Sequence, residues 1–170
     1  MPITFANEQN ISALVKLMDS AYRGENSKKG WTSEAHLLLG EKRTDETIVS
    51  QLMKTPGAVF LKYLNDQGEI NGCVFLQKNE ERLYLGMLCV SPDTQANGIG
   101  KQLMMQAEEH ARQAGCTSIY MSVISVRTEL ISWYERKGYK KTGETKPFPV
   151  DHRFGIPTQP LEFLILEKVL

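Results

Sequence analysis

The sequence predicts an α/β fold in which a mixed, mostly antiparallel sheet is covered by helices. Three apolar segments, residues 58–64, 70–76 and 83–90, follow one another across short turns, which is typical of an antiparallel meander. The third segment is followed by a helical pattern and then by another strand-like segment, residues 118–124. A strand, a helix and a strand in direct succession predict a parallel pair joined by a crossover helix.

Before the meander, the sequence predicts one short strand and two helices. Residues 2–5 form the strand, and Asn7 can cap the first helix. The apolar residues of that helix recur at helical spacing: Ile11, Leu14, Val15, Met18 and Tyr22. Thr44 or Asp45 can cap the second helix, which carries Val49 on its apolar side.

After the crossover helix, which Gly115 ends, the sequence predicts one more helix and two closing strands. The helix covers residues 128–137 and ends at Gly138. The strands cover residues 139–142 and 161–169, with a proline-bearing loop between them. The prediction is therefore a sheet of about seven strands with about four helices.

Composition limits the classes of function. The 170 residues are enough for one domain with a real core, and no repeat or linker divides residues 1–170, so we expect a single domain. Basic and acidic residues number 20 each, so no overall field favours a nucleic acid or an anionic membrane as partner. No apolar run is long enough to span a bilayer, and no signal peptide is recognisable. Three separated cysteines in apolar surroundings indicate buried thiols and a cytoplasmic protein.

The most informative motif lies between residues 83–90 and the crossover helix, in the stretch Gln95-Ala96-Asn97-Gly98-Ile99-Gly100. A turn that leads directly into a helix leaves backbone N–H groups unpaired at the helix N-terminus. The helix dipole favours negative charge there, and glycines let a ligand approach the backbone closely. The motif therefore predicts an anion site, most plausibly for a phosphate group.

Two common nucleotide motifs do not match this turn. A nucleoside-triphosphate P-loop has a Lys followed by Ser or Thr after its second glycine, whereas Gly100 is followed by Lys101 and Gln102. A dinucleotide fingerprint has a third glycine three residues after the second, and Leu103 occupies that position. A nucleotide-binding domain is nevertheless an alternative, and it would predict thermal protection by NAD or ATP.

The remaining pattern, Gln-x-x-Gly-x-Gly after a strand, resembles the coenzyme-A-binding motif of the GNAT superfamily of N-acetyltransferases. The order of elements is similar over nearly the whole chain. The segment Val126-Arg127-Thr128-Glu129-Leu130-Ile131-Ser132-Trp133-Tyr134-Glu135-Arg136-Lys137-Gly138-Tyr139 resembles the second signature of the family, a helix carrying Tyr-Glu-Lys-x-Gly-Phe/Tyr. The resemblance implies a splayed sheet with helices on both faces.

The resemblance also implies a binding mode for acetyl-CoA. The pantetheine arm would lie between two diverging strands and bond to the backbone of Leu88, Cys89 and Val90. The pyrophosphate would contact backbone N–H groups from Gln95 through Ala96, Asn97, Gly98, Ile99 and Gly100 to Lys101, whose side chain could add a positive charge.

The same resemblance assigns catalytic roles. Tyr134 matches the tyrosine that donates a proton to the coenzyme sulfur, and the amine would attack the thioester directly. A backbone N–H near Val90 would stabilise the oxyanion. Many relatives have a glutamate at the position of Tyr84, and tyrosine is a poor base near neutral pH. Glu162, Asp151, His152 or a chain of waters could serve instead, so no base is assigned.

The acceptor pocket should form from the irregular segment 23–40, the strand bearing Tyr84 and the proline-bounded loop near residues 148–154. Trp31, Glu34 and Tyr84 are the candidate substrate-binding residues, and Glu34 could attract a cationic amine. Many relatives have Asn at the position of Arg127. Arg127 could bind a coenzyme phosphate or a substrate carboxylate through its planar fork, or form a salt bridge with Glu129.

The resemblance thus implies an acyltransferase that moves an acetyl group from acetyl-CoA to a primary amine of a small molecule or peptide. No cluster of metal ligands is recognisable, so no metal is expected. No nucleic acid or membrane partner is expected, and a homodimer is compatible with the resemblance. The alternative is a catalytically silent acyl-CoA-binding regulatory module. The sequence does not identify the acceptor or exclude acyl groups other than acetyl.

Overall fold

The computed structural model describes residues 2–23, 27–28, 30 and 32–170, with the backbone alone at residues 95–97. In this part of the chain, a seven-stranded sheet has the order β1-β3-β4-β5-β6-β9-β7. Its strands are β1 (Ile3–Phe5), β3 (Ala58–Leu64), β4 (Ile70–Asn79), β5 (Arg82–Val90), β6 (Ser118–Ile124), β7 (Lys140–Pro147) and β9 (Glu162–Val169). The helices are α1 (Ile11–Tyr22), α2 (Glu46–Lys54), α3 (Ile99–Gln113) and α4 (Thr128–Glu135). The predicted mixed, mostly antiparallel sheet with four α-helices is confirmed.

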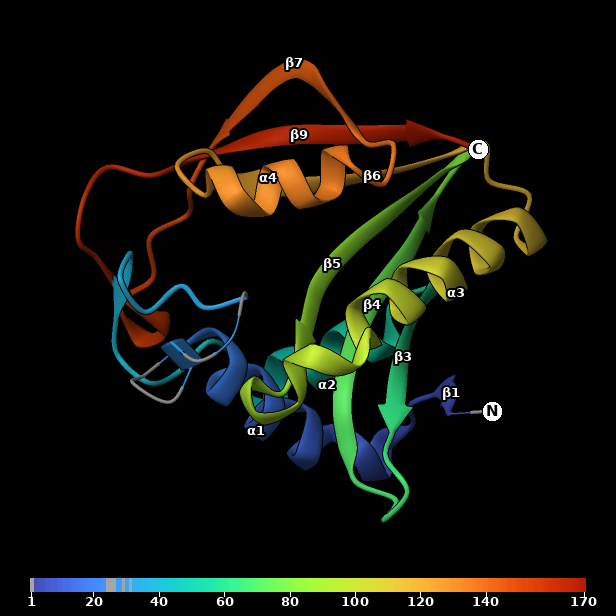
Figure 1. Cartoon of the computed structure of the whole chain (residues 1–170), viewed down its shortest axis with the longest axis horizontal. Helices are drawn as coiled ribbons and strands as arrows, with labels where there is room; N and C mark the ends of the chain where they lie inside the picture. Colours follow the sequence, from blue (N-terminus) through green and yellow to red (C-terminus); the bar gives the residue numbers. More distant parts are fainter. Residues whose placement is uncertain (1, 24–26, 29, 31) are drawn as a thin grey trace.

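The sheet divides where β5 meets β6. The pairs β3–β4 and β4–β5 are antiparallel, as predicted for the meander, and β5 and β6 are parallel. The β5–β6 pairing runs only from Arg82 and Ser118 to Tyr84 and Tyr120. Beyond these residues the two strands diverge, and Figure 1 shows them meeting near the C-terminus and spreading apart towards the other end. The expected splay of the sheet is therefore present.

Helices cover both faces of the meander because side chains alternate along its strands. On β4, Cys73 and Phe75 pack in one apolar cluster with residues of α1 and α2. Val74 and Leu76 point the other way and pack in a second cluster with residues of α3 and α4. Figure 1 shows α3 on the opposite side of β4 and β5 from α1 and α2.

The helix ends agree closely with the cap signals in the sequence. The carboxylate of Asp45 accepts a hydrogen bond from the backbone N–H of Ile48 at 2.8 Å, so Asp45 rather than Thr44 caps α2. Asn7 caps a short 3₁₀ turn, η1 (Glu8–Asn10), which leads directly into α1. The predicted start of α3 at Ile99 is confirmed, and Gly115, with φ +78°, follows its last turn.

A small second sheet is absent from the sequence prediction. β2 (Leu38–Leu39), in the segment expected to be irregular, pairs antiparallel with β8 (Ile156–Pro157). Two-residue strands are too short for an alternating pattern, which is why the sequence does not reveal them. The β7 strand also extends beyond the predicted residues 139–142. The sequence does not reveal its full length because the strand is exposed throughout and lacks an alternating apolar pattern.

The described residues contain neither a helix able to cross a bilayer nor a cluster of metal-binding side chains. Neither α1–α4 nor any shorter described helix has the length and apolar character needed to cross a bilayer. The same residues contain no group of three or more His, Cys, Asp or Glu side chains arranged for a metal ion.

Candidate active site

A cavity of about 450 Å³ lies where β5 and β6 diverge. Residues 85–88 of β5 and residues 121–124 of β6 line its two walls. Tyr134 of α4 lines it as well, and Phe154 and Gly155 approach from the loop before β8. The cavity therefore lies beside the part of β5 that no longer pairs with β6, which begins after Tyr84.

The backbone of β5 is distorted beside this cavity. The β4–β5 register shifts between Cys73 and Phe75, and Met87 on the opposite strand has a positive φ of 53°. Such a bulge bends a strand and redirects its peptide groups. The carbonyl of Leu88 accepts a hydrogen bond from the Tyr22 hydroxyl, which ties the end of α1 to the distorted strand. Of the predicted backbone contacts, Leu88 lines the cavity, and Cys89 and Val90 continue the strand beyond it.

The predicted anion site has the backbone expected of a helix start. A 3₁₀ segment, η3 (Pro92–Asn97), leads to Gly98, which has φ +67° and is the N-cap of α3. Gly98, the N-cap, has no side chain that could bond to the first turn of α3, and that turn contains no acidic residue. Residues 95–97 are described by their backbone alone, and Lys101 is exposed. The orphan N–H groups of the first turn thus lack a side-chain partner among the described residues, as an anion site requires.

Tyr134 is held at the cavity wall by its neighbours in the core. Its side chain is 5% exposed, and its ring meets the ring of Tyr139 edge-on at 6.0 Å. Its hydroxyl makes no hydrogen bond with a described residue. Burial raises the pKa of Tyr134 well above its usual value, while Arg127 acts in the opposite direction and lowers the pKa. The phenol is therefore protonated at neutral pH and can donate a proton into the cavity.

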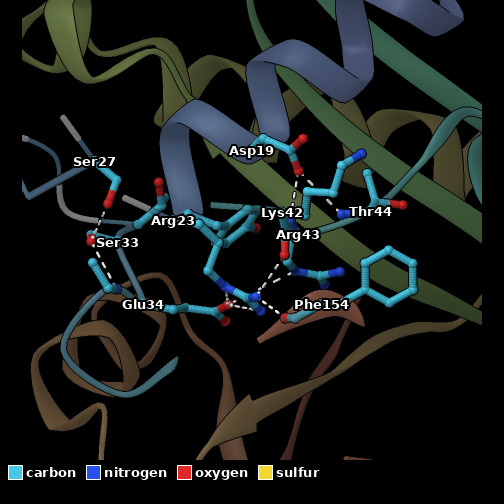
Figure 2. Close-up of polar contacts among 12 residues, drawn as sticks. Asp19, Arg23, Ser27, Ser33, Glu34, Lys42, Arg43, Thr44 and Phe154 are labelled. Atoms are coloured by element: carbon cyan, nitrogen blue, oxygen red, sulfur yellow. Dashed lines mark hydrogen bonds and ion pairs between the residues drawn. The ribbon is translucent and has the colours of Figure 1, made fainter. Parts of the chain in front are cut away.

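Glu34 also lines the cavity, but arginines surround it. The Glu34 carboxylate lies 3.0 Å from Nη2 of Arg23, 3.8 Å from Nε of Arg43 and 3.9 Å from Nη1 of Arg127. Figure 2 shows Arg23 and Arg43 converging on Glu34 from different segments. The side chains of Glu34 and Arg127 are 10% and 8% exposed. The predicted Glu34 and Arg127 therefore lie together in one buried ion-pair cluster.

Of the other two predicted acceptor-binding residues, Tyr84 lies in the described part of the chain and lines the cavity. Its ring lies over Gly86, where an added Cβ would be only 2.8 Å from the Tyr84 hydroxyl. Burial raises the pKa of Tyr84, so its phenol is uncharged at neutral pH and lines the cavity without acting as a base. Trp31 lies outside the described residues. Phe163 packs against Phe148 at 5.2 Å between ring centroids, and both line the cavity.

The described carboxylates in the cavity wall are already paired with arginines. Besides Glu34, the wall contains Asp151, whose carboxylate lies 2.7 Å from Nη2 of Arg153. Hydrogen bonds from Arg153 lower the pKa of Asp151, which makes it a weaker base. Glu162 and His152, the other candidate bases, are not among the lining residues.

Comparison with known proteins identifies the family. The model of the "Acetyltransferase (GNAT) family" matches residues 14–139, which is most of the chain. The protein belongs to the GNAT acetyltransferase family. The matched region contains both the turn at Gly98 and the helix carrying Tyr134.

Individual relatives of this GNAT chain are distant. Acetyltransferase Atu2258 of Agrobacterium fabrum is 30% identical over 83 residues, which are 49% of this chain and 59% of that protein. A ribosomal-protein-alanine N-acetyltransferase from Brucella melitensis has a similar structure, with a TM-score of 0.72, 18% identity and full coverage of both chains. The structure of yncA from Salmonella typhimurium with its cofactor acetyl-CoA has a TM-score of 0.69 and 15% identity, covering 99% and 92% of the two chains. These solved structures share the fold.

Sequence reasoning missed Arg23 and Arg43 as parts of the site. Arg23 follows the last residue of α1 and is the first residue of the segment 23–40 that was expected to form the acceptor pocket, but it was not singled out as a site residue. Arg43 lies between that segment and the start of α2. Neither belongs to a motif. Their position at the edges of a long irregular segment was the one available signal.

Proposed function

We propose that the protein transfers an acetyl group from acetyl-CoA to a primary amine of a small molecule or peptide by direct attack. The observation that carries this proposal is the position of Tyr134, whose side chain lines the cavity where β5 and β6 part. The unpaired edge of β5 can hold the coenzyme, and a proton donor beside it can protonate the coenzyme thiolate as that thiolate leaves. The fold of relatives such as yncA, solved with acetyl-CoA, supports the same choice of donor.

The chain has suitable groups for both ends of coenzyme A. The side of β5 that loses its partner after Tyr84 can pair with the amide groups of the pantetheine arm. The N–H groups at the start of α3, after Gly98, can bind the pyrophosphate, and Lys101 can add a positive charge. When bound, acetyl-CoA supplies the thioester carbonyl that the amine attacks.

In the proposed reaction, the amine nitrogen forms a bond to the acetyl carbon and the carbon–sulfur bond breaks. Tyr134 donates its proton to the departing sulfur and is reprotonated from solvent. A backbone N–H near Val90 stabilises the oxyanion that forms during attack. Because Glu34 and Asp151 are paired with arginines, the proton of the amine leaves to water rather than to a dedicated base.

A catalytically silent acyl-CoA-binding module is the second candidate, and the paired state of Glu34 and Asp151 is the observation that favours it. Measurement of free-thiol release from acetyl-CoA, with and without a panel of primary amines, separates the two. The enzyme releases thiol in proportion to one or more amines and yields the acetylated amine. Tight binding of acetyl-CoA without thiol release for every amine would favour the silent module.

A further inference from the structure

The cavity beside Tyr134 carries more positive than negative charge. Its described lining contains four arginines and two carboxylates, although the whole chain is formally neutral. The charged lining residues are Arg23, Arg43, Arg127, Arg153, Glu34 and Asp151. Since charge interactions are stronger in a partly enclosed cavity than in open solvent, the excess favours a negatively charged group on the ligand.

The surroundings of Glu34 argue against attraction of a cationic amine. Three guanidinium groups lie within 4 Å of its carboxylate, at 3.0, 3.8 and 3.9 Å. A cation that approached Glu34 would meet these arginines first, and like charges repel. The carboxylate is better explained as the group that holds the arginines together in a buried position.

The guanidinium of Arg23 is occupied by hydrogen bonds within the protein. Its Nε and Nη2 both donate to Glu34, and its Nη1 donates to the carbonyls of Lys42 and Phe154. Its side chain is only 3% exposed. Arg23 thereby ties the end of α1 to the loop that covers the cavity, and it has little capacity left for a ligand.

Arg43 differs, because only its Nε faces Glu34. Its two terminal nitrogens make no hydrogen bond with a described residue, and its side chain is 28% exposed. Figure 2 shows the guanidinium extending from Nε away from Glu34. These terminal nitrogens form the planar fork that binds a carboxylate through two parallel hydrogen bonds.

The fork of Arg43 is held in place before any ligand arrives. The carboxylate of Asp19 accepts hydrogen bonds from the backbone N–H groups of Arg43, at 2.5 Å, and Thr44, at 3.2 Å. The guanidinium lies over the ring of Tyr22, 5.2 Å from its centroid. Next to it, Thr44 lines the cavity with a buried hydroxyl that has no partner among the described residues. Preorganised groups of this kind lower the cost of binding.

The size of the cavity restricts the acceptor. About 450 Å³ must hold the thioester end of the donor as well as the amine. The loop at Phe154 and Gly155, which closes one side, is fixed by Arg23, and an added Cβ on Gly155 would lie 2.7 Å from Nη1 of that arginine. A small molecule fits this space better than a protein chain.

From the fork at Arg43 and the size of the cavity, we infer that the acceptor is a small amine that also carries a carboxylate, as a free amino acid does. Arg43 binds that carboxylate, and this contact directs the amine towards the thioester beside Tyr134. The inference rests on the proposed acetyl transfer and names the substrate class for it.

The test compares carboxylates with matched carboxamides. Thiol release is measured with the standard α-amino acids, β-alanine and γ-aminobutyrate, each beside its own amide. We expect at least one acid to have a kcat/KM about tenfold or more above that of its amide. Arg43→Gln should lower kcat/KM for that acid by about 10- to 100-fold and leave the amide within about threefold. Arg112→Gln, on exposed α3 surface, should leave both unchanged.

Equal or better use of the amides, or an equal effect of Arg43→Gln on both, would overturn the inference while acetyl transfer stands. Absence of thiol release with every amine would instead refute the proposed function. In that case calorimetry, which measures binding of each acid and its amide to the protein in the presence of coenzyme A, still tests the carboxylate site at Arg43. Binding of an acid in preference to its amide supports a carboxylate site, and equal or absent binding overturns it.

Discussion

Arg23 shows at the residue scale how the site is supported. Arg23→Met leaves the buried Glu34 with one partner fewer and removes the bonds to Lys42 and Phe154. Breaking a buried pair in this way costs about 3–5 kcal/mol of the free energy of unfolding. Urea unfolding measures the loss. Arg153→Met breaks an exposed pair with Asp151 and should give no measurable change, so equal losses in the two variants would contradict the structural role of Arg23.

The sequence predicts individual site residues only where a motif marks them. Tyr134 could be assigned because Gly138 and Tyr139 follow it at a recognisable spacing. Arg43 could not be assigned in this way, because its role depends on contacts that form only in the tertiary structure. These are its ion pair with Glu34 and the hydrogen bond from its backbone N–H to the carboxylate of Asp19. Such contacts join different segments and leave no periodic signal.

At the element scale, the position of α3 depends on Gly72 of β4. A Cβ at Gly72 would lie 2.9 Å from Cγ2 of Ile99 and 3.0 Å from Cδ1 of Leu103, both in the first turns of α3. Gly72→Ala should therefore displace the start of the helix, lower stability by about 1–3 kcal/mol and weaken coenzyme A binding several-fold. Urea unfolding and calorimetry measure the two effects.

Gly68→Ala provides the matched control for Gly72→Ala. Gly68 has φ +78° in the turn between β3 and β4, and its added Cβ meets nothing within 4 Å, α3 included. The substitution should strain the backbone and lower stability without changing coenzyme affinity. If both variants weakened coenzyme binding alike, the loss would reflect general destabilisation and not the position of α3.

Element boundaries were predicted well where packing imposes a pattern. β3, β6 and the start of α3 match the sequence prediction because each buries one face or stripe. β7 is exposed throughout, and β2 and β8 have two residues each, so none of the three carries that pattern.

For the whole molecule, the paired carboxylates predict an unusual pH dependence. The acceptor reacts only as a neutral amine, and burial raises the pKa of Tyr134, so the phenol keeps its proton throughout the neutral range. We expect kcat/KM to rise with pH and level off at the pKa of the acceptor ammonium. Two acceptors whose ammonium pKa values differ by about two units should shift the profile by the same amount. A bend near pH 6–7 that is identical for both acceptors would indicate a base on the enzyme.

We propose that Tyr134 protonates the sulfur of coenzyme A at the end of the cleft between β5 and β6. The most direct measurement is kcat together with the Kd of acetyl-CoA for Tyr134→Phe, beside Tyr139→Phe. Tyr139 is an adjoining buried tyrosine whose hydroxyl has no partner among the described residues and does not line the cavity. We expect Tyr134→Phe to lower kcat by about a hundredfold or more while the Kd of acetyl-CoA stays within about threefold, and we expect Tyr139→Phe to retain activity. Unchanged kcat in Tyr134→Phe would contradict the proposed proton transfer.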